Sequence, residues 1–368
     1  MLVGIDASRA VVDRPTGTEI YSRRVIQELL TLDSPHRFRL YVRTNPPDHL
    51  FEGAELRLIP CPRLWTHTRL AWEMVRRPPD LLFVPAHVIP PVHPRLSLVT
   101  IHDLGYLYFP RAHPWHQRIY LDLSTRWNAR TAAHILADSE ATKADLVARY
   151  GTSPHRITVA YPGTDGSLGA VDDRLVIQAA KDRYRIPGDY FLYIGTLQPR
   201  KNLRRLVDAY AELAVRRSEA PIHLVLAGKR GWLYDELLEH VRGRGLEGRV
   251  HFPGYVAQED KAALLSGALG FVFPSLHEGF GLPVLEAQAC RCPVVTSTSS
   301  SLPEVAGRGA LLVDPRDTRA IADAMERLMA EPGLVDQLVE RGLGNVKHFS
   351  WRACARRILE VIDQVSGP

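Results

Sequence analysis

Cysteine is scarce in this chain of 368 residues, which contains only Cys61, Cys290, Cys292 and Cys354. Four cysteines are too few for a disulfide framework, and the single Cys-x-Cys lacks the second ligand pair that a zinc site needs. Charged residues interrupt the amino terminus before any apolar run of signal-peptide length, and no later run reaches the ~20 apolar residues that span a bilayer. We therefore expect buried free thiols in a cytoplasmic protein.

Two common binding signatures are also missing. No Gly-x-Gly-x-x-Gly follows the first apolar run, which disfavours a Rossmann dehydrogenase. The arginines do not interleave with aromatic residues in the manner of nucleic-acid-binding modules, so we expect no nucleic-acid partner. The length and the hydrophobic content of 45% instead suit two globular domains of ordinary size.

Most of the net charge of +5 lies in the first 165 residues. Within them, the segment RLWTHTRLAWEMVRR at 63–77 places Leu64, Trp65, Trp72 and Val75 among four arginines. This composition suits the surface of an anionic bilayer and predicts peripheral association with the inner face of a membrane. The alternative is a helix that packs its tryptophans on the core of the domain, and both interpretations stay open at this point.

Short runs rich in Val, Ile and Leu alternate with amphipathic stretches, which is typical of parallel sheets covered by helices on both faces. The sequence therefore predicts an α/β fold with two doubly wound parallel sheets. In the first half the runs are LVGIDA (2–7), RFRLYV (37–42), DLLFVP (80–85), LSLVTIHD (96–103), HILADS (134–139) and RITVAYP (156–162). In the second half they are YFLYIG (190–195), PIHLVLAG (221–228), RVHFPG (249–254), LGFVFPS (269–275), CPVVTS (292–297) and GALLVDP (309–315).

The series pauses at 163–187, where glycines and prolines flank polar sequence, and then starts afresh. We predict one Rossmann-like domain over 1–168 and a second over 169–348. The sequence of the carboxyl end predicts three helices. We expect the last of them to lie within 349–368, to have Ser350 as its N-cap and to pack back on the first domain. Because ligands bind outside the carboxyl ends of parallel strands, we expect the two domains to face each other across a cleft.

The segment PSLHEGFGLPVLEAQACRCPVV begins at the end of a predicted strand and enters a helix. Gly279 and Gly281 let the backbone approach a ligand, and Pro283 suits the first helical turn. The free amides of that turn favour an anionic group such as phosphate. Glu278 and Glu286 bracket the turn, and each carboxylate can accept two hydrogen bonds from a sugar diol. The alternative for Glu286 is that it only complements the helix dipole.

This arrangement of two glutamates resembles the E-x7-E motif of glycosyltransferase family 4, a family of retaining enzymes with the GT-B fold. The resemblance covers nearly the whole chain, and it implies two facing Rossmann-like domains, an acceptor domain and a donor domain. The segments that carry it are PTGTEIYSRRVIQEL (15–29), VTIHDL (99–104), FLYIGTLQPRKN (191–202), VLAGKRG (225–231), VHFPGYV (250–256) and PVVTSTSSSLPEVAGRGALLVDP (293–315).

The resemblance also implies roles for residues of the second domain. Glu278 is expected to contact the transferred sugar, and Glu286 to bind the ribose of the nucleotide. Arg200 and Lys201 are expected to offset the diphosphate charge, as a divalent metal does in other enzymes. Some relatives carry an arginine where this chain has Thr196, so the cationic load is expected to rest on Arg200 and Lys201. The remaining donor-binding residues of this domain are expected to act through their backbone and are Gly254, Tyr255, Val256, Gly279, Phe280, Gly281 and Leu282.

In the first domain, His102 and Asp103 follow a predicted strand. The resemblance makes His102 a sugar-contacting residue, while Asp103 is expected to orient His102 or a neighbouring loop. Gly17 and Thr18 match a glycine-rich turn after the first strand that lets the backbone approach the diphosphate. Without the resemblance, a lone histidine after a strand is more often structural.

The function that the resemblance implies is retaining transfer of a hexose from a nucleotide diphosphate sugar to a glycan, lipid-linked or small-molecule acceptor. No cofactor and no metal are expected, because the sequence has no Asp-x-Asp pair and a diphosphate oxygen can take the acceptor proton. Similarity of 15–29 and 301–315 to bacterial mannosyltransferases of O-antigen and exopolysaccharide assembly favours GDP-mannose, while a UDP-sugar such as UDP-glucose stays open. The alternatives are a nucleotide-sugar epimerase of GT-B fold and a non-catalytic sugar-binding or scaffold protein.

One departure from the family pattern concerns the end of the helix that carries Glu286. Relatives commonly have glycine where this chain has Arg291, which predicts a left-handed backbone at that position. A residue with a β-carbon adopts that conformation at a cost of roughly 1 kcal/mol.

Overall fold

The computed structural model describes residues 1–12, 17–47, 49–61, 63–86, 88–110, 114–164, 166, 168–217 and 221–367. The chain divides into two compact units. Unit 1 comprises Met1–Leu107, Trp115–Gly163 and Phe349–Pro368, and unit 2 comprises Tyr108–Pro114 and Thr164–His348. The main division thus follows Gly163, whereas the sequence analysis placed it after residue 168.

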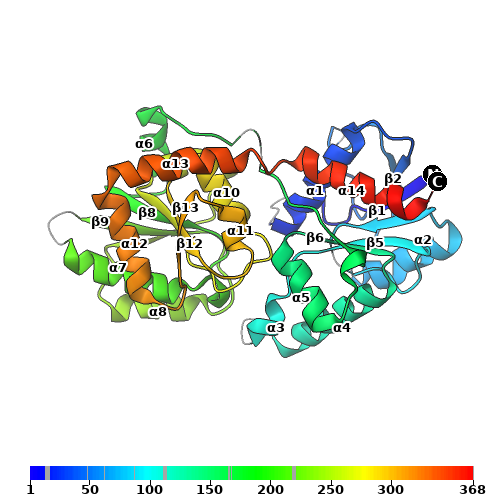
Figure 1. The fold of residues 1–368 in the computed structure, drawn as a ribbon, viewed down its shortest axis with the longest axis horizontal. Coiled ribbons are helices and arrows are strands. Elements are labelled where there is room, and N and C mark those ends of the chain that lie inside the picture. Colours follow the sequence, from blue (N-terminus) through cyan, green and yellow to red (C-terminus); the bar gives the residue numbers. More distant parts are fainter. Residues whose placement is uncertain are drawn as a thin grey trace. The chain divides into compact units, whose positions relative to one another are not determined.

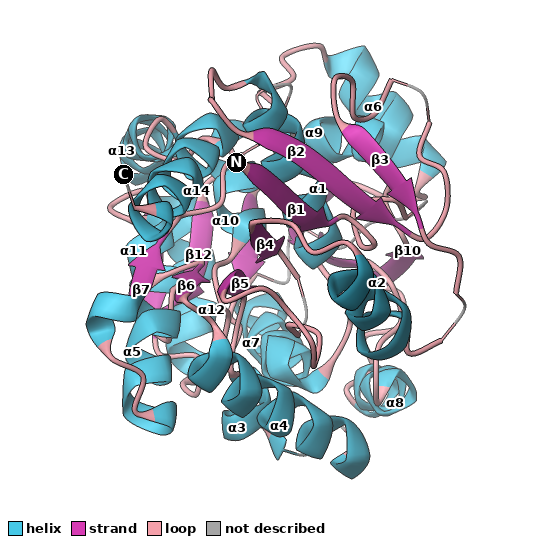
Figure 2. Cartoon of the chain, turned by 90° about the vertical axis from the view of Figure 1, so that its right-hand side faces the viewer, coloured by secondary structure: helices cyan, strands magenta, loops and turns pink. Residues whose placement is uncertain are grey.

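The described strands of unit 1 form one parallel sheet in the order β3-β2-β1-β4-β5-β6-β7, and Figure 2 shows them side by side. The strands are β1 (Leu2–Asp6), β2 (Arg37–Val42), β3 (Glu55–Leu58), β4 (Leu81–Val84), β5 (Leu96–Ile101), β6 (His134–Ala137) and β7 (Ile157–Val159). The helices are α1 (Gly17–Thr31), α2 (Ala71–Arg76), α3 (Gly105–Tyr108), α4 (Trp115–Thr131), α5 (Glu140–Tyr150) and α14 (Trp351–Ser366). A π-helical turn, Thr66–Leu70, precedes α2.

The described strands of unit 2 form a second parallel sheet in the order β10-β9-β8-β11-β12-β13, the strand order of a Rossmann fold. The strands are β8 (Asp189–Ile194), β9 (Ile222–Ala227), β10 (Val250–Gly254), β11 (Gly270–Phe273), β12 (Val294–Ser297) and β13 (Ala310–Val313). The helices are α6 (Arg174–Arg183), α7 (Leu203–Arg216), α8 (Tyr234–Gly243), α9 (Gln258–Ser266), α10 (Leu282–Ala289), α11 (Leu302–Ala306), α12 (Thr318–Ala330) and α13 (Pro332–Val346). Figure 1 shows helices on both faces of each sheet.

Burial along the strands explains why the predicted α/β fold forms. Every residue of β4, β11 and β12 is buried, as expected for central strands of a sheet covered on both faces. Each of the twelve predicted apolar runs coincides with one strand of the two sheets, although β8 begins one residue before its run, so the two doubly wound sheets are confirmed. The sequence analysis missed β3, because this edge strand exposes Glu55, Leu56 and Leu58 and lacks an apolar run.

The three predicted carboxyl-terminal helices are present as α12, α13 and α14. The Ser350 hydroxyl accepts a hydrogen bond from the backbone amide of Ala353 at 3.1 Å, which caps α14 as predicted. Helix α14 packs against α1 in unit 1 (Figure 1). Gly163 permits this return of the chain, because a β-carbon there would lie 2.0 Å from the backbone nitrogen of Trp351.

Candidate active site

A short turn after strand β8 carries two adjacent cations, Arg200 and Lys201. Residues Pro199–Lys201 form a single 3-10 turn, and α7 begins two residues later at Leu203. Asn202 adopts a left-handed conformation, with φ of 63°. Its side-chain nitrogen Nδ2 donates to the carbonyl oxygens of Pro274 (3.0 Å) and Pro315 (2.5 Å). These bonds tie the turn to the loops that follow β11 and β13, so the position of Lys201 is fixed by the sheet.

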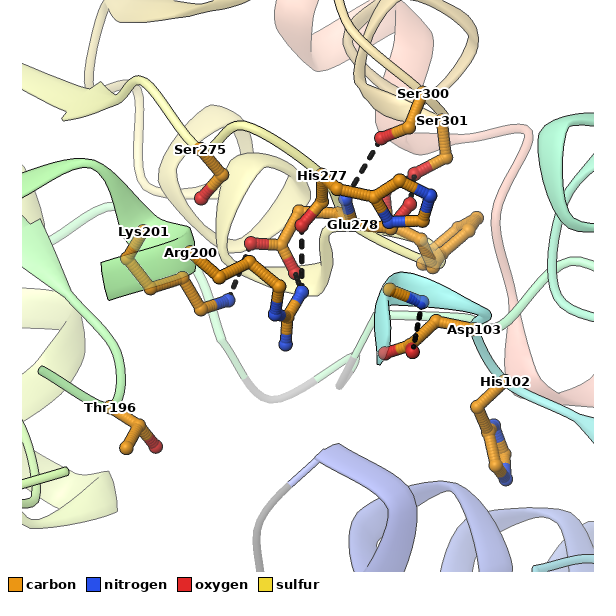
Figure 3. Close-up of polar contacts among 12 residues, drawn as sticks. His102, Asp103, Thr196, Arg200, Lys201, Ser275, His277, Glu278, Ser300 and Ser301 are labelled. Carbon is orange, nitrogen blue, oxygen red and sulfur yellow. Dashed lines mark hydrogen bonds and ion pairs between the residues drawn. The ribbon is translucent and has the colours of Figure 1, made fainter. Parts of the chain in front are cut away.

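Glu278 lies in the loop between β11 and α10 and binds both cations (Figure 3). Its Oε1 atom accepts a hydrogen bond from Lys201 Nζ at 2.5 Å, and its Oε2 atom accepts one from Arg200 Nη1 at 3.0 Å. Arg200 Nη1 also donates to the backbone oxygen of His277 at 2.7 Å. The structure therefore brings three predicted site residues into direct contact.

This ion cluster is nearly dry, because the side chains of Arg200, Lys201 and Glu278 are 14%, 11% and 8% exposed. Burial pushes the pKa of Glu278 up, but Lys201 and Arg200 together pull it below its ordinary value. Glu278 is therefore ionised at neutral pH.

Two serines that the sequence analysis did not single out hold the loop of Glu278. The Ser300 hydroxyl accepts a hydrogen bond from the Glu278 amide at 2.8 Å. The Ser301 hydroxyl lies 2.9 Å from the backbone oxygen of Glu278 and 2.6 Å from that of Phe280 and shares its proton between them. Both serines follow β12, the strand next to β11. Adjacency of strands in the sheet was the signal that could have found them.

The turn into α10 has the predicted geometry. Gly281 has φ of 115°, in the region that favours glycine, and a β-carbon there would lie 2.8 Å from Leu302 Cδ2. Helix α10 begins at Leu282, with Pro283 in its first turn, where a missing N–H costs no helical bond. The start of this helix, where the helix dipole favours an anionic ligand, therefore follows directly on the loop of Glu278.

Glu286 lies one turn further along α10 and is not in the cluster of Glu278. Its Oε1 atom accepts a hydrogen bond from Lys261 Nζ, on α9, at 2.8 Å. Both side chains are mostly buried, at 16% and 12% exposure. Sequence reasoning missed Lys261, whose position in a helix of mixed polarity gives no signal. The lysine fixes one oxygen of Glu286, which leaves the other for a ligand.

The predicted base-selecting segment follows β10. Gly254 has φ of 82°, and a β-carbon there would meet no atom within 4 Å. Its backbone oxygen accepts a hydrogen bond from the Gly228 amide at 2.7 Å. Val256 is buried, whereas Tyr255 is exposed with Lys229 Nζ 5.7 Å from its ring centre.

In unit 1, His102 follows β5 and is held at both ring nitrogens. Nδ1 lies 2.6 Å from Oδ2 of Asp138, at the end of β6, and Nε2 donates to the backbone oxygen of Pro85 at 2.9 Å. Burial alone would lower the pKa of His102, but Asp138 and the Pro85 carbonyl raise it above its ordinary value. Tyr21 of α1 packs edge-on against the ring at 4.8 Å.

The carboxylate that orients His102 is therefore Asp138, which sequence reasoning missed. Asp103 instead accepts a hydrogen bond from the Gly105 amide at 3.0 Å and supports the start of α3, which agrees with the second of its two predicted roles. Strands β5 and β6 are neighbours, so their carboxyl ends bring His102 and Asp138 together.

Comparison with known proteins assigns the chain to a family. A profile described as Glycosyltransferase Family 4 matches residues 15–167, and one described as Glycosyl transferases group 1 matches residues 178–343. O-antigen chain mannosyltransferase B of Escherichia coli is 32% identical over 308 residues, which cover 82% of this chain and 79% of that protein. The chain belongs to glycosyltransferase family 4. It is a glycosyltransferase.

Further relatives support the family and its fold. Serotype-specific mannosyltransferase WbdA of Escherichia coli is 34% identical over 186 residues, which cover 50% of this chain and 23% of that protein. HepE of Anabaena, solved with UDP and glucose, superposes with a TM-score of 0.75 at 17% identity over 98% of each chain. Sucrose-phosphate synthase of Thermosynechococcus elongatus gives 0.76 at 22% identity over 99% of this chain and 98% of that one. The fold of this glycosyltransferase is therefore GT-B, as predicted.

One expectation for the glycosyltransferase needs correction. Gly17 and Thr18 were expected in a loop after β1, but they form the first turn of α1. The preceding Pro15 and Thr16 lie outside the described residues. These two residues therefore belong to the start of a helix rather than to a loop.

The side chains of the segment 63–77 are divided between the core and the surface of unit 1. Trp65 is buried and its Nε1 donates to the Ile59 carbonyl oxygen at 2.7 Å, so this tryptophan belongs to the core and not to a membrane-facing surface. Leu64, Trp72 and Val75 are 69%, 56% and 56% exposed. None of the described helices is long and apolar enough to cross a membrane.

Arg291 has φ of 56°, which confirms the predicted left-handed backbone after α10. Its guanidinium nitrogen Nη1 lies 3.1 Å from Oδ1 of Asp172, and both side chains are more than half exposed.

Proposed function

We propose that this glycosyltransferase transfers mannose from GDP-mannose with retention of anomeric configuration and without a metal ion. The observation that carries the proposal is the buried cluster of Arg200, Lys201 and Glu278 at the carboxyl ends of β8 and β11. It combines two fixed cations, which suit a diphosphate, with a carboxylate, which suits sugar hydroxyls. The start of α10 adds the positive end of a helix dipole after the loop of Glu278.

The proposed reaction needs little from the protein beyond charge and position. The acceptor oxygen bonds to the anomeric carbon on the face that the diphosphate leaves, the bond from that carbon to the phosphate oxygen breaks, and the departing phosphate oxygen takes the acceptor proton. Negative charge grows on the diphosphate during this step. Lys201 and Arg200 stabilise it because they are preorganised and mostly buried, which takes the place of a divalent cation.

The other donor contacts in the proposal come from the remaining site residues. Glu286, fixed by Lys261, binds the ribose through its second oxygen. The backbone of 254–256 selects the base, and His102 contacts a sugar hydroxyl. The amides at Gly17 and Thr18, at the start of α1, approach the diphosphate.

Mannose is the proposed sugar because O-antigen chain mannosyltransferase B and WbdA both carry that activity in their names. UDP-glucose is the second candidate, since HepE was solved with UDP and glucose. A panel of nucleotide sugars tested for thermal stabilisation separates them. A bound donor at a hundred times its dissociation constant adds about 2.7 kcal/mol to the free energy of unfolding. Stabilisation by UDP-glucose and not by GDP-mannose would reject the mannose assignment.

The proposed acceptor is a glycan or a lipid-linked or small molecule, and we propose peripheral membrane association through unit 1. Helix α4 supports this beside the segment 63–77, since it exposes Trp115, Ile119 and Leu123 at helical spacing. The hydroxyl of Tyr120, also on α4, lies 3.0 Å from His67 Nε2, so the two segments are neighbours.

Sedimentation with anionic vesicles at low and physiological salt tests the membrane proposal. Replacing Trp115 and Leu123 together by serine should reduce binding. The matched control replaces Leu175 and Val215, exposed residues of unit 2, and should not. Absence of vesicle binding at both salt concentrations would reject the proposal.

A further inference from the structure

The two cations of the proposed diphosphate site already have an anionic partner inside the protein. Lys201 uses one oxygen of Glu278 and Arg200 uses the other, as Figure 3 shows. Because the three side chains are mostly buried, solvent screens these contacts weakly. A single carboxylate thus neutralises much of the charge that a donor diphosphate would need to meet.

The same geometry shows what must happen when a diphosphate binds. Both carboxylate oxygens of Glu278 lie against cations, at 2.5 and 3.0 Å. A phosphate group offers the same kind of oxygen ligand with more charge and more acceptor sites. The carboxylate and the diphosphate carry the same sign of charge, so they compete for Lys201 and Arg200. Release of at least one cation also frees an oxygen of Glu278 for a sugar hydroxyl.

We propose that Glu278 is the resident counterion of the anion site formed by Arg200 and Lys201, and that the donor diphosphate displaces it from at least one of them. This inference rests on the proposed function, because it takes the ligand of the site to be a nucleotide diphosphate. When no diphosphate is bound, Glu278 compensates the charge of the two buried cations. The negative charge of Glu278 repels an incoming anion, so an anion with little charge does not replace it on Arg200 and Lys201. A polyanion such as a diphosphate can compete with Glu278 for these two cations.

Isothermal titration calorimetry with inorganic pyrophosphate tests the counterion role. Glu278→Gln keeps the shape of the side chain and removes its charge. Pyrophosphate should bind this variant at least about tenfold more tightly than the parent, the size expected when a like charge close to an anion is removed. Glu340→Gln, an exposed glutamate on α13, is the matched control and should leave the pyrophosphate affinity unchanged.

A second variant covers the case in which Glu278→Gln does not fold, since that change leaves two buried cations uncompensated. Glu278→Asp keeps the charge but is one methylene shorter and cannot hold both cations as Glu278 does. Its pyrophosphate affinity should exceed that of the parent by less than the gain in Glu278→Gln. Thermal unfolding with and without pyrophosphate gives the same comparison for a variant of low stability.

The outcomes separate this inference from the proposed function. If pyrophosphate binding is weakened by Lys201→Ala but is unchanged or weaker in both Glu278 variants, the anion site stands and the counterion role is overturned. If Lys201→Ala leaves pyrophosphate binding unchanged, the anion site itself is rejected, and with it the proposed function. Tighter binding in the Glu278 variants together with weaker binding in Lys201→Ala supports both.

Discussion

Each unit of this glycosyltransferase has a buried carboxylate at the carboxyl edge of its sheet, but the partners differ in kind. In unit 2, Glu278 binds a lysine and an arginine, whose charges persist across the working pH range. In unit 1, Asp138 binds His102, a titratable residue whose pKa this carboxylate raises above its ordinary value. The first pairing suits a site that must hold a permanent positive charge for a diphosphate. The second makes the geometry of a predicted sugar contact depend on pH.

The largest expected effect comes from the permanent charge of unit 2. Lys201→Ala should lower turnover by about 10²–10³, because one preorganised cation beside the developing anion is lost. Steady-state kinetics with the preferred donor measures it. Lys347→Ala, an exposed lysine of the same unit, serves as the control. Turnover of Lys201→Ala within threefold of the parent would remove Lys201 from the mechanism.

A tenfold effect should distinguish the two glutamates of unit 2. Glu286→Gln should weaken binding of free GDP by about tenfold, since a charged acceptor for the ribose hydroxyls becomes neutral. Glu278→Gln should not weaken it, because that residue opposes the diphosphate. Calorimetry with GDP gives both values. Equal losses in the two variants would show that the roles have been assigned wrongly.

The titratable pair of unit 1 should affect stability in a pH-dependent way. The pKa of folded His102 lies above its ordinary value, so the stabilisation from this pair is complete below that ordinary value and is lost as pH rises through the folded pKa. The parent should therefore have a higher free energy of unfolding than Asp138→Asn, and this difference should be larger at pH 6 than at pH 8.5. Guanidinium unfolding at both pH values measures the difference.

Replacing the histidine checks the cause of that pH dependence. His102→Gln removes the titrating partner. The pH dependence of the unfolding free energy that is lost in Asp138→Asn should therefore be lost in His102→Gln as well. If the difference in unfolding free energy between the parent and Asp138→Asn is the same at pH 6 and at pH 8.5, the pair does not change its protonation between these two pH values.

The smallest effect is expected at a position outside both pairs. Arg291→Gly relieves a left-handed backbone, worth roughly 1 kcal/mol, and removes an exposed ion pair with Asp172, worth about 0–1 kcal/mol. The two terms nearly cancel, so the unfolding free energy should change by less than about 1 kcal/mol and donor affinity should stay the same. A clear loss of donor affinity in a folded variant would place Arg291 in the site.

The two sheets could be predicted from the sequence, because their central strands are buried on both faces and therefore appear as apolar runs. It failed at β3, whose exposed edge position leaves Glu55 and Arg57 in the strand and no apolar run. It singled out Glu278 because this residue precedes the turn of Gly279 and Gly281, whereas Arg200 and Lys201 were expected only through the resemblance to glycosyltransferase family 4.

The residues that the sequence did not reveal act across the sheet. Asp138 meets His102, 36 positions away, and Ser300 meets Glu278 from the loop after the neighbouring strand. Lys261 reaches Glu286 from another helix. These contacts depend on which strands and helices are neighbours, and local periodicity does not contain that information. Strand order therefore has to be known before such supporting residues can be found.

We propose that this glycosyltransferase transfers mannose with retention and without a metal ion at the cluster of Arg200, Lys201 and Glu278. Proton NMR of GDP-mannose turnover in the presence of a metal chelator tests it most directly, with water as the acceptor and the anomeric signals recorded before mutarotation. We predict that mannose first appears as the anomer present in the donor, at a rate that Lys201→Ala reduces by about 10²–10³. Initial release of the opposite anomer, or loss of turnover in the chelator, would contradict the account.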